Sequence, residues 1–132
     1  MSAEYTFPSH FPHDCPPNPQ EELPGIYYRV VPSETLSNRE NFQSHFELNL
    51  RPDLEDSEPC SRRAVSMFGS YASAVNLSKQ YPNKGKFIAS LNLNGGHGIV
   101  HKSENNKWRS HHNWWLPNGI DPTHYCTEIK GC

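Results

Sequence analysis

Apolar positions along the chain fall into short runs, and several runs alternate with polar residues. The clearest is 86–93, in which apolar side chains at every second position alternate with Ile88, Ser90 and Asn92. A period of two is typical of a strand with one buried face. β-Branched and aromatic residues favour further strands at 26–31, 64–68, 98–101, 111–115 and 125–129.

Two segments carry helix signals. Ser70 can cap a helix over 71–81, whose buried stripe would include Ala74, Leu77 and Tyr81. A capping box favours a second short helix over 38–47. Asn94-Gly95-Gly96 is a hairpin signal, which predicts that 98–101 returns beside the strand ending at 93.

Residues 1–24 hold six prolines, so neither a helix nor a central strand fits there. Because the segment also carries Tyr5, Phe7 and Phe11, we expect an arm packed on the domain. The remaining residues, 25–132, are predicted to form a single α+β domain. Its sheet would be small and mostly antiparallel, with five or six strands and two short helices.

Composition excludes some classes of protein. The net charge of −2 argues against a dedicated nucleic-acid binder. The sequence has no apolar run long enough for a membrane helix and no secretory signal pattern at its start. The four cysteines form no C-x-x-C pair, so we expect reduced thiols in a cytoplasmic protein. A small molecule or a protein is the expected partner.

The densest group of chemically useful side chains is the segment Ser110-His111-His112-Asn113-Trp114-Trp115. In an extended segment, neighbours point to opposite faces. One of Trp114 and Trp115 would then enter the core while the other lines a surface pocket, and the two histidines would divide likewise. A histidine beside an indole can donate a hydrogen bond or move a proton near neutral pH. The alternative is that both indoles fill a small hydrophobic core and the two histidines hydrogen-bond to backbone carbonyls.

Arg29 lies within an otherwise apolar strand, where a guanidinium needs an anionic partner or a groove. Its planar fork suits a carboxylate or a phosphate. We therefore expect either a phosphorylated ligand or an ion pair with Glu47 or Glu128. In the last predicted strand, Cys126 and Glu128 would share the face opposite Ile129.

Over nearly its whole length, the chain resembles a group of small bacterial proteins. This resemblance implies no activity. The matching residues are Phe11-Pro12, Cys15-Pro16-Pro17, Tyr28-Arg29-Val30-Val31, Phe42-x-Ser44-x-x-Glu47, Ser66-x-Phe68 and Ser110-His111-His112-x-Trp114-Trp115.

The chain also resembles the ADP-ribosyltransferase-like fold. That fold often has Arg or His in its first strand, then Ser, Thr or Tyr in a strand ahead of a helix, and Glu in a last strand. Arg29, Ser66 and Glu128 repeat this order, although residue 126 is Cys where many transferring members carry Glu or Gln.

This resemblance implies NAD⁺ as the ligand. Arg29 would hold a phosphate or ribose, Ser66 would brace the nicotinamide ribose, and Glu128 would hold a ribose hydroxyl and stabilise the transition state. An aromatic ring would stack on nicotinamide, supplied by Tyr71, Trp114 or Trp115.

Three functional hypotheses follow. The first is an NAD⁺-processing enzyme whose catalytic residues come from Arg29, Glu128, His111 and His112. The second is a non-catalytic interaction module that uses the His-His-x-Trp-Trp surface. The third is a metal-dependent hydrolase built on histidines, although we assign no metal ligand because no carboxylate or cysteine lies at ligand spacing. Its residues would be His97, His101, His111 and His112.

Overall fold

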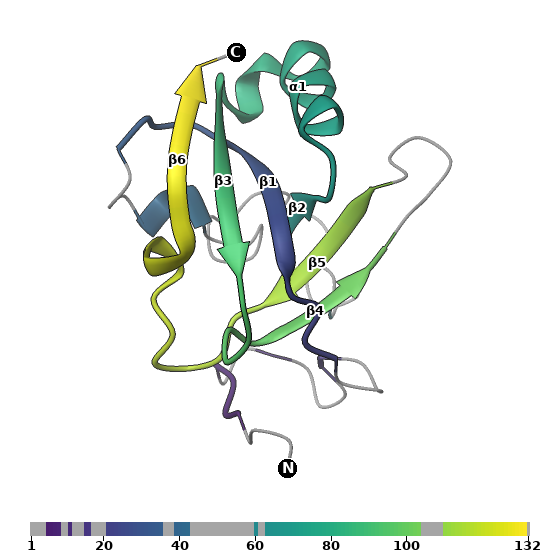
Figure 1. The fold of residues 1–132 in the computed structure, drawn as a ribbon, viewed down its shortest axis with the longest axis vertical. Coiled ribbons are helices and arrows are strands. Elements are labelled where there is room, and N and C mark those ends of the chain that lie inside the picture. Colours follow the sequence, from purple (N-terminus) through teal and green to yellow (C-terminus); the bar gives the residue numbers. More distant parts are fainter. Residues whose placement is uncertain are drawn as a thin grey trace.

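A computed structural model describes most of the chain: residues 5–8, 11, 15–16, 21–35, 39–42, 60, 63–103 and 110–131. In these residues, six strands form one antiparallel sheet with the order β4-β5-β2-β1-β3-β6 (Figure 1). The strands are β1 (Gly25–Val31), β2 (Val65–Phe68), β3 (Phe87–Leu93), β4 (Ile99–Lys102), β5 (His111–Trp115) and β6 (Cys126–Gly131). The predicted antiparallel α+β class is confirmed.

The sheet consists of two three-stranded halves. Seven residue pairs join β1 to β3, and four join β2 to β5, but a single pair, Tyr28 with Phe68, joins β1 to β2. In Figure 1, β4 and β5 run obliquely to β1, β3 and β6. We call the line between β1 and β2 the seam. Backbone groups along such a line need partners other than a ladder.

The main core lies on one face of the sheet. Register places Tyr27 and Val31 of β1, Met67 of β2 and Trp114 of β5 on this face, and Phe42 packs against it. Phe42 ends the short 3-10 helix η1 (Arg39–Phe42), which occupies the start of the helix predicted over 38–47. Residues 43–47 of that prediction lie outside the described residues.

The opposite face carries the α-helix. α1 (Tyr71–Gln80) begins after Ser70, whose hydroxyl accepts the backbone N–H of Ser73, as the capping prediction requires. Ala74 is buried against Phe68 of β2 and Ile88 of β3. The predicted inclusion of Tyr81 in the buried stripe is wrong: the helix ends at Gln80, and Tyr81 is 42% exposed.

The hairpin predicted at Asn94-Gly95-Gly96 is also wrong. β3 already has β1 and β6 as neighbours, so β4 pairs with β5 at the far edge of the sheet. Gly95 and Gly96 have φ values of 105° and 69°, which turn the chain out of the sheet. His97 then becomes fully buried, and its carbonyl accepts the indole N–H of Trp114.

β6 departs from simple alternation. Its register against β3 shifts between Ser90 and Leu91, so Cys126 lies opposite Leu91 while Glu128 lies opposite Ser90. Cys126 and Ile129 therefore pack against the main core, and Glu128 points to the other face. The predicted common face for Cys126 and Glu128 is wrong because a bulge adds one residue.

The predicted reduced state of all four thiols is wrong as well. Cys15 and Cys60 form a disulfide between residues 45 apart in sequence. Cys15 packs with Ile99 of β4 and Trp115 of β5, and three aromatic residues of the N-terminal segment join them, namely Tyr5, Phe7 and Phe11. The described part of that segment thus contacts the α1 face of β4 and β5.

The described part of the chain holds no helix with the length and apolar character needed to cross a membrane.

Candidate functional site

Arg29 bridges the seam. Its Nε donates to the carbonyl of Asn41 at 2.7 Å, and its Nη1 donates to the carbonyl of Ser66 at 2.6 Å. The side chain approaches from the main-core face and holds β1 close to β2 where the ladder pairing is sparse. Both of these partners are neutral backbone carbonyls, whereas the sequence predicted an anionic partner or a groove. Of the two predicted ionic partners, Glu47 lies outside the described residues, and Glu128 pairs with Lys130 at 3.2 Å.

Ser66 and His111 meet on the opposite face of the seam. Ser66 Oγ lies 2.5 Å from His111 Nε2, and His111 Nδ1 lies 3.2 Å from the carbonyl oxygen of Ser103. Both side chains are half-buried. Arg29 therefore contacts the Ser66 backbone from the main-core face, whereas the Ser66 hydroxyl and the His111 ring lie on the opposite face of the sheet.

The hydrogen bonds determine which nitrogen of His111 carries the proton. A carbonyl oxygen only accepts, so Nδ1 carries the hydrogen that it donates to Ser103. In the neutral ring, Nε2 is then an acceptor, and the Ser66 hydroxyl is the donor. This is the arrangement in which a histidine can take a proton from a serine.

Burial favours the neutral form of this ring. Desolvation lowers the pKa of His111 below its usual range, and the positive charges of His112 and Arg29 act in the same direction, against the opposing hydrogen bond to Ser103. At neutral pH the imidazole is therefore an unprotonated base.

Aromatic rings flank the pair. The ring of Phe68 meets His111 edge-on at 5.5 Å, and Tyr28 meets Tyr71 at the same centroid distance. Tyr28 lies opposite Phe68 across the seam, and Tyr71 begins α1 with 40% of its surface exposed. Tyr71 thus presents part of its ring to solvent beside the seam.

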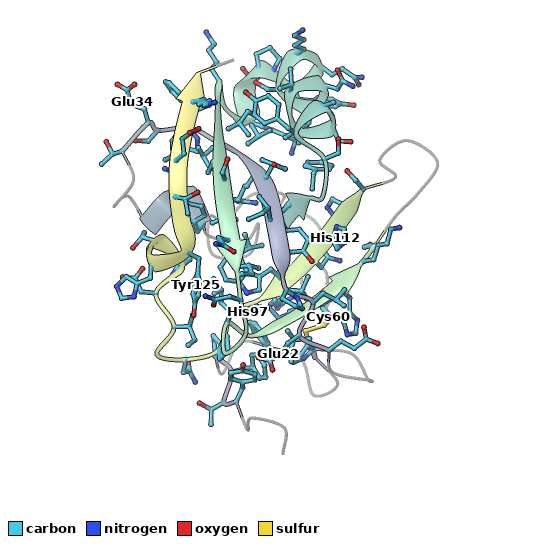
Figure 2. All side chains as sticks on the ribbon, viewed as in Figure 1. Glu22, Glu34, Cys60, His97, His112 and Tyr125 are labelled. Carbon is cyan, nitrogen blue, oxygen red and sulfur yellow. A yellow bond between two sulfur atoms is a disulfide. The ribbon has the colours of Figure 1, made fainter. Side chains whose placement is uncertain are left out.

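His112 and the two tryptophans lie elsewhere. His112 points to the main-core face, where its ring centroid lies 4.9 Å from that of Tyr27. The two histidines therefore point to opposite faces, as predicted. Figure 2 shows His112 on β5, away from His97. The prediction that one indole lines a surface pocket is wrong, since Trp114 is 0% and Trp115 is 3% exposed. Trp114 fills the main core, and Trp115 packs in a cluster with Cys15, against which Cys60 is partly buried.

Glu128 is separated from the group at the seam. Register relates His111 to Phe68, then Tyr28, Ser90 and finally Glu128, which is four strand spacings. At about 4.8 Å per spacing, the two backbones are roughly 19 Å apart. Glu128 and His111 therefore cannot act on the same bond.

A second polar cluster surrounds His97, and sequence reasoning did not find it. The Glu22 carboxylate accepts the Tyr5 hydroxyl and the backbone N–H of Gly96, and Tyr125 donates its hydroxyl to the Gly96 carbonyl (Figure 2). His97 Nδ1 accepts the N–H of Gly95, and its Nε2 has no hydrogen-bond partner among the described residues. The contacts join segments distant in sequence, so no local pattern signals them.

The described residues contain no group of three or more His, Cys, Asp and Glu side chains able to hold a metal ion. His97 is buried at the end of the turn after β3, and His101, four residues further on, lies on β4.

The neutral histidines make stability depend on pH. Desolvation lowers the folded-state pKa values of His97 and His111 below the ordinary value of about 6.5. Their contribution is complete above that pH and is lost as pH falls through the folded-state values, because the unfolded chain then binds more protons. We expect the Tm to fall by several degrees between pH 7.5 and pH 5.5.

Thermal unfolding followed by circular dichroism checks this. Replacing both histidines by Asn should flatten the dependence, whereas His124→Ala, at a side chain 78% exposed, should leave it unchanged. An equal pH slope in the wild type and the double variant would contradict the assignment.

Comparisons with protein-family models, curated proteins and solved structures found no match for this chain.

Proposed function

We propose that the chain is an enzyme that binds NAD⁺ at the seam and cleaves the bond between nicotinamide and ribose. The observation that carries the proposal is the hydrogen-bonded pair of Ser66 and His111 on one face of the seam, with Arg29 bonded to the Ser66 carbonyl from the other face. Arg29 in the first strand and Ser66 in a strand ahead of a helix are also the residues that the resemblance to the ADP-ribosyltransferase-like fold selects.

Charge favours an anionic ligand. Arg29 and, when protonated, His112 are the charges that act on His111, and both are positive. Both charges lie on the main-core face, so this field would attract a pyrophosphate at the seam only across the sheet, and the two carbonyl contacts give Arg29 a positioning role.

His111 takes the role that the resemblance gave to Glu128. Its Nε2 is a hydrogen-bond acceptor and can hold a ribose hydroxyl where the Ser66 hydroxyl lies in the free protein.

We expect purified wild-type protein to release nicotinamide from NAD⁺, measured by chromatography. His111→Ala should lower the rate by about a hundredfold, because it removes the acceptor at the seam. Glu128→Ala and the exposed His124→Ala should both retain the wild-type rate. An inactive wild type that also gives no heat on titration with NAD⁺ would refute the proposal, and equal loss in Glu128→Ala would place the site elsewhere.

The two ends of α1 give a matched test of ring stacking. Tyr71 and Tyr81 are 40% and 42% exposed, but only Tyr71 contacts Tyr28 beside the seam. We expect Tyr71→Ala to weaken NAD⁺ binding about tenfold in calorimetric titration, the typical cost of losing one stacking ring. Tyr71→Phe and Tyr81→Ala should bind as the wild type does. Equal weakening by Tyr71→Ala and Tyr81→Ala would show that the ring has no stacking role.

No observation on the described residues supports either alternative hypothesis. The interaction module needed an indole surface, and both indoles are buried. The metal-dependent hydrolase needed gathered ligands, and the described residues bring no such set together.

A further inference from the structure

The Ser66–His111 pair has the geometry of a nucleophile and its base, which the proposed glycosidic reaction does not require. The 2.5 Å contact lets the hydroxyl hydrogen point at Nε2, and the Ser103 carbonyl holds the ring in the tautomer that can accept it. A third group that orients the base completes the arrangement found at activated serines.

Other described serines have different surroundings. Ser78 is buried and donates to the carbonyl of Gly85, and Ser70 Oγ caps the first turn of α1. Ser90 is half-buried on the same face as Ser66, but register places it on β3, between Tyr28 and Glu128. Ser66 is the one for which the structure gives a hydrogen bond to a histidine.

From this geometry we propose that Ser66 is a serine nucleophile with His111 as its general base, so that the seam has an acyl-transfer activity toward carboxylic esters. Ser66 Oγ attacks the carbonyl carbon and forms a C–O bond while its proton passes to His111 Nε2. The ester C–O bond then breaks, and the alcohol leaves with the proton from His111. Water, deprotonated by the same nitrogen, hydrolyses the acyl-serine to the acid and restores Ser66.

This activity needs no glycosidic bond, so it stands or falls separately from NAD⁺ cleavage. It also requires a neutral His111. Partial burial lowers the pKa of His111, which favours that state at neutral pH.

The experiment treats the full chain with a fluorophosphonate probe, which phosphonylates activated serines, and locates the adduct by peptide mass spectrometry. We expect one adduct, at Ser66, and none in Ser66→Ala. His111→Gln should slow labelling by about a hundredfold, as expected for loss of a general base. Ser90→Ala, a half-buried serine on the same face, should label as the wild type does.

Two further readouts separate catalysis from structure. The labelling rate should rise with pH to a plateau reached below neutrality, and p-nitrophenyl acetate should be hydrolysed with the same dependence. Circular dichroism of each variant checks that it is folded. An unlabelled wild type, an adduct on another serine, or labelling that His111→Gln leaves unchanged would each overturn the proposal, whatever the result with NAD⁺.

Discussion

Replacing both Cys15 and Cys60 by Ser should lower the free energy of unfolding by about 4 kcal/mol, the loop-entropy value for a closed loop of this length. The disulfide joins Cys15 of the N-terminal segment to Cys60, which precedes β2 in the sequence. The Cys60 carbonyl also accepts the indole N–H of Trp115, so the bond fixes the cover of that ring. We expect the Tm to fall by about 10–20 °C.

Thermal and urea unfolding of the wild type, the double variant and Cys126→Ser test this. Cys126 is the free, half-buried cysteine of the described residues and serves as the control, with a much smaller expected change. Thiol titration of the unfolded wild type should find two fewer free thiols than the sequence contains. Four free thiols, or equal stability of the double variant and the control, would contradict the prediction.

A disulfide is typical of proteins that mature in oxidising compartments, which is at odds with the expected cytoplasmic location. The same titration on protein isolated without reductant therefore bears on the compartment as well.

We expect Trp114→Ala to lower the free energy of unfolding by about 4 kcal/mol, the largest effect of any single substitution in the main core. The indole is fully buried, and its ring centroid lies 6.0 Å from that of Tyr125. Its N–H donates to the carbonyl of His97 at 2.8 Å. Its removal leaves a cavity and takes the donor from a buried carbonyl.

Urea unfolding measures the loss. The control is Tyr81→Ala, which removes a ring that is 42% exposed and should cost less than about 1 kcal/mol. Equal costs for the two substitutions would show that Trp114 is not a core residue.

Local signals predicted the elements of this fold well. The alternation of apolar and polar residues predicted β3, and Ser70 as a capping residue predicted the start of α1. Both signals depend only on residues that are neighbours in sequence. Non-local features were missed. The order of strands depends on which edges are free, so the glycines after β3 could not reveal that β4 pairs with β5. The bulge in β6 shifts one residue and has no marker of its own.

The candidate site shows the same division. The unusual place of Arg29 in an apolar strand predicted an anionic partner or a groove, whereas the two partners at the seam are neutral backbone carbonyls. The pairing of Ser66 with His111 depends on the register of β2 and β5, which the sequence does not specify locally. The orientation of the His111 ring depends on a backbone carbonyl, and because every residue has one, it leaves no signal in the sequence. Trp115 is buried in a cluster with the disulfide-bonded Cys15 and Cys60, which only the tertiary structure brings together.

Backbone chemical shifts of the full chain show whether NAD⁺ binds at the seam. On titration with NAD⁺, we expect saturable shifts concentrated at Ser66, His111 and Tyr71 and little change around Glu128. No shifts at millimolar NAD⁺, or shifts centred on β6, would contradict it.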